Sequence, residues 1–170
     1  MKNLILGALL SALSLIVIGC AKEEPVETAE ATQPDPAYLA GSEPAGAVGV
    51  GDARSSAKDD EDVVLVGRIG GSRKPFVEGL AAFTIVDPKV PHCPAEEGCP
   101  TPWDYCCAQD AVKDNIATIK IVDKAGNPVS KDARQLLGVK ELNLVVIEGK
   151  AQRDEEGNLS ILADQVFVKK

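Results

Sequence analysis

Five segments between residues 62 and 168 combine apolar and polar residues in the manner of β-strands. They are short and rich in valine and isoleucine, and residues 116–121 alternate between the two kinds of residue. A period of two places every other side chain on the same face of a strand, so each segment is expected to bury one face. The segments are DVVLVGRIGG, GLAAFTIVD, NIATIKIVD, ELNLVVIEGKAQR and LSILADQVFV.

A short helix is predicted between the third and fourth strands, in PVSKDARQLLGV. Ser130 is suited to cap its start and Gly138 to end it. Three strands, a helix and two strands are the element order of the OB-fold, a small five-stranded β-barrel. Gly67 and Gly149 interrupt the first and fourth strands, where a closed barrel needs its strands to bend or bulge. The alternative is a small antiparallel sandwich with the same number of strands.

The first 19 residues have the pattern of a secretory signal. One lysine precedes an apolar run from Leu4 to Ile18, which is too short and too rich in small residues for a good transmembrane helix. The run ends in Val17-Ile18-Gly19-Cys20, which resembles the lipobox of bacterial lipoproteins. The resemblance implies cleavage before Cys20 and a lipid anchor on that cysteine. Ala21, in place of an aspartate, implies the outer membrane. The alternative is a secreted protein in which Cys20 is incidental.

Residues 20–62 are predicted to be a disordered acidic tether. They are rich in Glu, Ala, Pro, Gly and Asp, a composition that does not favour a packed core. Residues 21–62 hold 11 acidic and 3 basic side chains, whereas residues 63–170 hold 15 and 14. The net charge of −8 therefore belongs mainly to the tether, and residues 63–170 are expected to form one nearly neutral domain.

The predicted domain lacks the features of a nucleic-acid-binding OB-fold. Its charge is nearly balanced, and of the second and third strands only the second offers an aromatic residue, Phe83. The loop after the first strand brings Arg73, Lys74 and Phe76 together, so it is a candidate for binding a small anion or else a solvated hairpin. The chain shows neither a phosphate-binding loop nor a nucleophile elbow, and we expect no enzymatic activity.

A cysteine-rich insertion, residues 88–114, separates the second and third strands. Within it, residues 92–107 hold four of the five cysteines, the single histidine and the single tryptophan. Thr101 is suited to cap a helical turn at TPWD, and Trp103 and Tyr105 form either a lid that packs the insertion onto the barrel or an exposed partner-binding patch.

Two disulfides are the expected state of these cysteines in an oxidising compartment. A bond between the adjacent Cys106 and Cys107 would be heavily strained. The pairings that remain are Cys93–Cys106 with Cys99–Cys107, or the exchanged set. Either set would order a loop that has no core of its own, and no cofactor would then be required.

Metal binding or thiol redox chemistry is the alternative for the same segment. The side chains of His92, Cys93, Cys99, Cys106 and Cys107 are soft ligands suited to zinc or copper. The spacing contains no Cys-x-x-Cys knuckle, so it does not specify a metal by itself.

The lipobox, the acidic tether, the five strands and the motif CPTPWDYCC together are similar to those of OB-like lipoproteins of planctomycete-type bacteria. This resemblance implies a location and a fold, and it implies no activity or site residues. We therefore predict a binding or structural module of the cell envelope, anchored on the periplasmic face through Cys20. An envelope protein is its expected partner, and nucleic acid is not.

Overall fold

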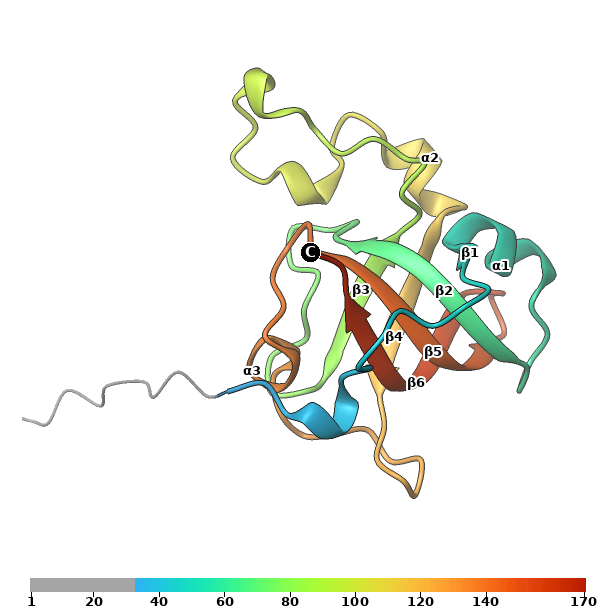
Figure 1. Ribbon diagram of the computed structural model, residues 1–170. Coiled ribbons are helices and arrows are strands. Elements are labelled where there is room, and N and C mark those ends of the chain that lie inside the picture. Colours follow the sequence, from blue (N-terminus) through green and yellow to red (C-terminus); the bar gives the residue numbers. More distant parts are fainter. Residues whose placement is uncertain (1–32) are drawn as a thin grey trace, which may run out of the picture. The chain divides into compact units, whose positions relative to one another are not determined.

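The computed structural model describes residues 33–170 (Figure 1), so the predictions for the signal sequence and Cys20 lie outside the described residues. The strands are β1 (Val48–Gly49), β2 (Asp62–Ile69), β3 (Ala82–Val86), β4 (Ile116–Ile121), β5 (Leu144–Arg153) and β6 (Leu159–Val168). The α-helices are α1 (Val50–Ser56), α2 (Gln109–Lys113) and α3 (Ala133–Leu137), and the 3-10 helices are η1 (Pro36–Tyr38), η2 (Ala95–Glu97) and η3 (Pro102–Asp104). Each predicted strand is present, and so is the helix between the third and fourth of them.

One mixed sheet contains all six strands, in the order β1-β2-β3-β4-β6-β5. A further pairing between β2 and β5 joins the five long strands into a ring. The β4–β6 and β1–β2 pairs are parallel and the other pairs are antiparallel. The strands therefore form a single sheet rather than the two stacked sheets of the alternative sandwich.

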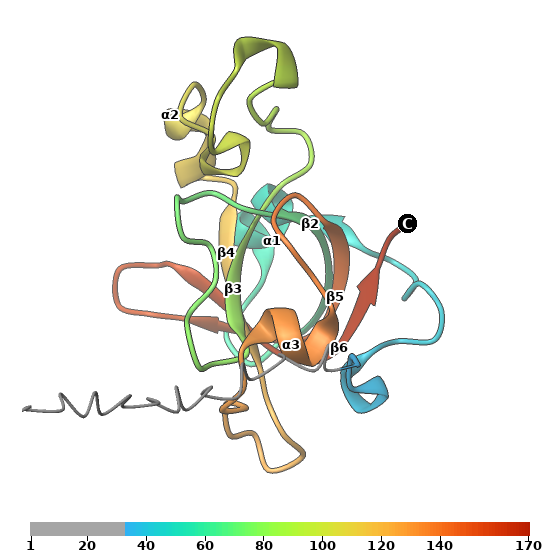
Figure 2. The same ribbon diagram turned by 90° about the vertical axis from the view of Figure 1, so that its left-hand side faces the viewer.

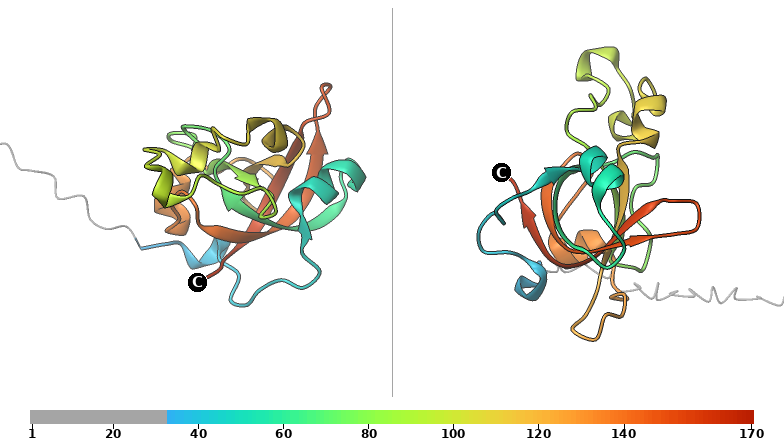
Figure 3. Two further views of the ribbon diagram at one scale, coloured as in Figure 1. Left: turned by 90° about the horizontal axis from the view of Figure 1, so that it is seen from above. Right: turned by 90° about the vertical axis from the view of Figure 1, so that its right-hand side faces the viewer.

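The core lies inside the ring and is closed by a helix at each end. Figure 2 looks onto the end at which α3 lies, and the right-hand view of Figure 3 looks onto the end at which α1 lies. Phe83 and Ile119 are fully buried and face each other across the β3–β4 pair. Val50 of α1 and Leu136 of α3 belong to the same buried cluster, so both helices contribute to one hydrophobic core.

The two strand glycines accommodate close neighbours. The register of the β5–β6 pair shifts between Glu148 and Gly149, and a Cβ at Gly149 would lie 2.8 Å from the Cα of Ala163. The predicted bulge is therefore confirmed at Gly149. At Gly67 a Cβ would lie 2.6 Å from the Cδ1 of Ile85, so this glycine makes room for a side chain of the neighbouring strand.

The boundaries of α3 agree with the sequence at one end only. Gly138 ends the helix in the left-handed conformation with φ 68°, as predicted. The cap at the other end is Asp132, whose side chain accepts a hydrogen bond from the amide of Arg134, and not Ser130.

The prediction of a disordered tether is wrong for residues 33–61, while residues 20–32 lie outside the described part. Leu39 forms a β-bridge with Val166, and Val50 and Ala53 are buried in the main core. Val50 and Ala53 of α1 and its C-cap residue, Ala57, are spaced as i, i+3 and i+7, which places them on the same side of the helix. The acidic composition hid this face because its apolar residues are few and small.

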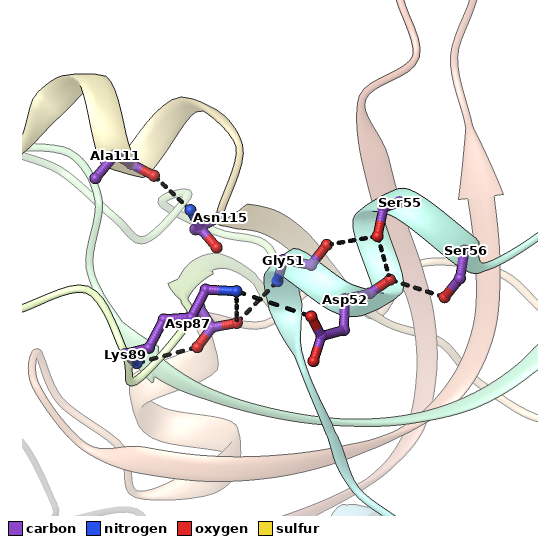
Figure 4. Close-up of polar contacts among 8 residues, drawn as sticks. All are labelled: Gly51, Asp52, Ser55, Ser56, Asp87, Lys89, Ala111 and Asn115. Atoms are coloured by element: carbon purple, nitrogen blue, oxygen red, sulfur yellow. Dashed lines mark hydrogen bonds and ion pairs between the residues drawn. The ribbon is translucent and has the colours of Figure 1, made fainter.

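Side chains from outside α1 complete both of its ends. The N-cap residue, Gly49, has no side chain, and the carboxylate of Asp87 accepts hydrogen bonds from the amides of Gly51 (2.9 Å) and Lys89 (3.0 Å; Figure 4). At the other end, the guanidinium of Arg153 donates to the carbonyl oxygen of Ala57 through Nε (3.1 Å) and Nη2 (3.0 Å). These contacts fix α1 to β3 and β5.

Figure 4 also shows polar contacts on the exposed side of α1. The hydroxyls of Ser55 and Ser56 donate to the carbonyl oxygen of Asp52, while the Asn115 side chain donates to Ala111 of α2. Arg54 of α1 donates to the carbonyl oxygen of Ile116 (3.3 Å), so α1 and the start of β4 lie close together. No helix within residues 33–170 has both the length and the apolar character to cross a membrane.

Two turns repeat the pattern Asp-x-x-Gly-Asn, at residues 123–127 and 154–158. In each turn the aspartate carboxylate accepts a hydrogen bond from the asparagine amide four residues later, at 2.9 Å for Asp123 and 2.7 Å for Asp154. The glycines, Gly126 and Gly157, adopt φ values of 83° and 79°. Both turns therefore use the same Asx hydrogen bonds and the same left-handed glycine.

Candidate metal centre

The cysteine-rich insertion forms a separate lobe between β3 and β4, at the top of Figure 1. It contains η2, η3 and α2 and is attached to the ring by a second buried cluster of Val86, Val90, Tyr105 and Val112. The predicted helical turn at TPWD is present as η3, from Pro102 to Asp104. The chain reverses after this turn, so that the four cysteines come from two short stretches that face each other.

Tyr105 anchors the lobe. Its side chain is fully buried and its backbone is left-handed, with φ 55°. The ring packs closely against Gly70, where a Cβ would lie 2.9 Å from Cε2 of the tyrosine. The hydroxyl has no hydrogen-bond partner among the described residues, and burial raises the pKa of Tyr105 to about 12. Of the two earlier interpretations, Tyr105 therefore fits the packed lid.

The sulfur atoms of the four lobe cysteines converge. The Sγ of Cys106 lies 3.4 Å from that of Cys93, 3.8 Å from that of Cys99 and 3.7 Å from that of Cys107. The Sγ atoms of Cys93 and Cys107 are 3.9 Å apart. Cys106 thus contacts three other sulfurs at once.

The predicted disulfides are not formed in the structure. All four cysteines are free thiols, and the contacts above exceed the disulfide bond length of about 2.05 Å by more than an ångström. The four sulfur–sulfur separations given above match the edges of a different geometry. A tetrahedron whose centre lies about 2.3 Å from each sulfur, the zinc–thiolate bond length, has edges of about 3.8 Å.

Asp104 holds the turn that presents Cys106. Its two carboxylate oxygens accept hydrogen bonds from the Thr101 hydroxyl (2.8 Å) and the Cys106 amide (2.9 Å). The bond from Thr101 is the main reason that the pKa of Asp104 is lowered. A carboxylate oxygen of Asp104 and the sulfurs of Cys93, Cys99 and Cys106 lie within 4.8 Å of one another, so this residue could also serve as a ligand.

The cluster is buried on one side and open to solvent on the other. Cys93 is buried, Cys99 is half-buried, and Cys106 and Cys107 are exposed. The amide of Cys107 donates to the Cys93 sulfur and lowers the pKa of Cys93, while the contact with Cys93 raises the pKa of Cys106. One sulfur is therefore predisposed to be the first thiolate of the group.

His92 is not part of the group of potential metal-binding atoms that lie within 4.8 Å of one another. Its ring centroid is 6.5 Å from that of Tyr105. The structure thus groups Cys93, Cys99 and Cys106 with Asp104. His92 and Cys107 lie outside this group, although the Cys107 sulfur contacts those of Cys93 and Cys106. Asp104 and Glu97, whose carboxylate lies 3.7 Å from the Cys107 sulfur, were not predicted as site residues.

The three residues of the candidate anion-binding loop, Arg73, Lys74 and Phe76, do not lie in one site. Phe76 is buried in the main core, with its ring 5.8 Å from that of Phe83 and the guanidinium of Arg134 stacked over it at 4.3 Å. Phe76 is therefore a core residue rather than a ligand contact. Arg73 and Lys74 are exposed, and the Arg73 carbonyl accepts a hydrogen bond from the indole of Trp103 (3.2 Å). This bond joins the loop to the lobe.

A groove that the sequence did not predict lies on the ring, away from the cysteines. It encloses about 680 Å³ and is bordered by β2, β5, β6 and the turn after β4. Lys150 and Asp62 form an ion pair of 2.6 Å within it, and the hydrogen bond from this pair raises the pKa of Lys150. The ammonium of Lys150 is thus already paired with a carboxylate of the same groove.

Comparison with known proteins gives no family for this chain: no family model matches it, and no curated protein is similar to it in sequence.

Proposed function

We propose that this chain is a metal-binding protein whose lobe holds a single zinc ion through Cys93, Cys99, Cys106 and Cys107. The observation that carries the proposal is the convergence of the four sulfurs at separations of 3.4–3.9 Å in the contacts around Cys93 and Cys106. Thiolates are soft ligands that bind zinc and copper(I) strongly, and zinc favours four of them in a tetrahedron.

The separations favour one ion over a polynuclear cluster, because every sulfur in contact with Cys106 is within one tetrahedron edge of it.

The lobe would also be stabilised by a crosslink. Its own buried cluster consists of Val86, Val90, Tyr105 and Val112, which is a small core for the 27 residues of 88–114. An ion that binds only the folded lobe would stabilise it by the free energy of binding.

The proposed metal lobe is carried on an OB-like barrel. The strand order, the helix between β4 and β5, the parallel β4–β6 pair and the closing β2–β5 pair support this assignment. The barrel would act as a rigid base, with the lobe displayed between its second and third strands. We propose a binding role rather than catalysis, and a protein of the cell envelope as the partner rather than nucleic acid.

The metal proposal is tested on the mature chain purified under reducing, anaerobic conditions. Elemental analysis should find about one zinc ion per chain, and cobalt substitution should produce the thiolate-to-cobalt charge-transfer absorption. Cys106→Ser should weaken zinc binding by more than about 100-fold, because Cys106 contacts the three other sulfurs. His92→Ala is the matched control and should leave the affinity unchanged. A reduced chain that binds neither zinc nor copper would overturn the proposal.

The envelope location is a separate proposal, supported by the lipobox sequence at Val17–Cys20. In a bacterial host the processed chain should partition into detergent, and Cys20→Ala should abolish both the processing and the partitioning. A wild-type chain that stays in the aqueous phase would overturn the lipid anchor and leave the metal proposal intact.

A further inference from the structure

We infer that the metal centre is also a thiol switch, in which a disulfide oxidant replaces the ion by two disulfides, Cys93–Cys107 and Cys99–Cys106. This inference rests on the proposed zinc site and adds the regulation of that site. It follows from three features of the sulfur cluster: which sulfurs are in contact, which of them are exposed, and which pairs can close together.

The contacts select the pairing. Of the two sets that avoid a bond between the adjacent Cys106 and Cys107, one pairs Cys93 with Cys106, whose sulfurs are 3.4 Å apart, but it also requires Cys99 to reach Cys107. No contact joins the sulfurs of Cys99 and Cys107, whereas each of the other sulfur pairs in the two sets is in contact. The other set uses Cys93–Cys107 at 3.9 Å and Cys99–Cys106 at 3.8 Å. Both pairs need to close by about 1.8 Å to reach the disulfide bond length.

The exposure of the sulfurs determines where oxidation begins. Cys106 and Cys107 are exposed on the turn between η3 and α2, whereas Cys93 is buried. An incoming oxidant therefore meets the exposed pair first. Each of these two sulfurs then has a different partner at 3.8–3.9 Å, so that both mixed disulfides can be resolved within the cluster.

The reaction consumes two molecules of a disulfide oxidant. The Cys106 thiolate attacks one oxidant sulfur, which forms a mixed disulfide and expels one oxidant thiolate. The Cys99 thiolate then attacks the Cys106 sulfur, closes the Cys99–Cys106 bond and expels the second oxidant thiolate. Cys107 and Cys93 react in the same way with the second oxidant molecule. The four protein thiolates thus lose four electrons, four oxidant thiols are formed after protonation, and the ion is released.

The inference is tested on zinc-loaded protein treated anaerobically with excess oxidised glutathione. A zinc-binding dye follows release of the ion, and a thiol reagent follows the loss of free cysteines. We expect one zinc ion to be released for every four thiols lost, and the intact mass to fall by four hydrogens with no glutathione retained. The reduced, zinc-loaded protein without oxidant is the control.

The pairing is tested with double variants that leave two cysteines each. The pair Cys99 and Cys106 remains in Cys93→Ser/Cys107→Ser, and the pair Cys93 and Cys107 remains in Cys99→Ser/Cys106→Ser. Both variants should form an internal disulfide with oxidised glutathione. The matched variant Cys93→Ser/Cys106→Ser leaves Cys99 and Cys107, and it should accumulate glutathione adducts, with internal closure at least about 10-fold slower.

The outcomes separate the inference from the proposed function. Failure of the reduced wild-type chain to bind zinc overturns the metal site and the switch together. Zinc binding with all four thiols retained under excess oxidant overturns the switch alone. Closure of the Cys99 and Cys107 pair as fast as the other two overturns the pairing.

Discussion

The carboxylate of Asp87 accepts a hydrogen bond from the amide of Gly51 at 2.9 Å, so the end of β3 caps the first turn of α1. Asp87 is 4% exposed, and its Oδ1 also accepts a hydrogen bond from the Lys89 amide. The Lys89 ammonium lies 3.4 Å from Oδ2 of Asp87, the oxygen that accepts from Gly51. The residue that follows β3 therefore fixes both the helix at one end of the ring and the start of the cysteine-rich lobe.

Replacement of Asp87 should destabilise the fold. Asp87→Ala leaves two backbone amides without their acceptor, so we expect the free energy of unfolding to fall by about 2–3 kcal/mol. Asp52→Ala is the control, because Asp52 is exposed on the same helix and should change stability by less than about 0.5 kcal/mol. Urea denaturation measures both, and equal losses in the two variants would contradict the capping role.

Removal of the Tyr105 hydroxyl should not destabilise the protein. The hydroxyl is buried without a partner among the described residues, so Tyr105→Phe removes an unsatisfied polar group while it keeps the packing of the ring. We expect the free energy of unfolding to stay the same or rise by about 1 kcal/mol. Tyr105→Ala should cost about 3–5 kcal/mol through loss of the buried ring. A loss above 1 kcal/mol for Tyr105→Phe, on thermal or urea unfolding, would show that the hydroxyl is satisfied in solution.

The two classes of glycine should respond differently to alanine. At Gly149 the added Cβ meets the backbone of β6, which cannot rotate away, so Gly149→Ala should cost about 3 kcal/mol or more. At Gly126 the space is open and only the φ of 83° opposes a side chain, so Gly126→Ala should cost about 1 kcal/mol. Urea denaturation distinguishes the two, and the reverse order of losses would argue against the bulge.

Stability should fall in acid partly through the two Asp-x-x-Gly-Asn turns. Hydrogen bonds from Asn127 and Asn158 hold the pKa values of Asp123 and Asp154 below the ordinary value of 3.8. A carboxyl whose pKa is lower in the folded chain adds stability above the unfolded pKa, and this stability is lost as the pH falls through the folded value. The double variant Asp123→Asn/Asp154→Asn should therefore be less stable than the wild type at pH 7, and the difference should shrink toward pH 2. A difference that is constant with pH, in urea unfolding, would contradict this assignment.

The strands could be predicted because their apolar positions recur with a period of two and because turn residues separate them. α1 could not, because its buried face consists of only Val50, Ala53 and Ala57 within an acidic, glycine-rich stretch. A short helix of this kind is stabilised by the ring it closes and by Asp87 and Arg153, which lie far away in the sequence. The composition of residues 50–57 alone therefore could not predict this helix.

The candidate site could also be predicted only in part. The clustering of four cysteines in 16 residues predicted that the lobe would be held together through sulfur. It could not distinguish pairs of sulfurs from a group of four, because that depends on the left-handed turn at Tyr105 and on the hydrogen bonds of Asp104. The position of His92 outside the group of potential ligands also depends on the tertiary fold, in which its ring lies 6.5 Å from that of Tyr105.

If Cys20 carries the proposed lipid, the bridge between Leu39 and Val166 limits the distance between the ring of strands and the membrane. With the chain fixed to β6 at this point and described from residue 33 onward, 12 residues (21–32) lie between Cys20 and the first described residue. Even a fully extended chain of that length spans no more than about 45 Å. A lipid on Cys20 would therefore confine the proposed metal lobe to partners and oxidants close to the membrane that holds the lipid.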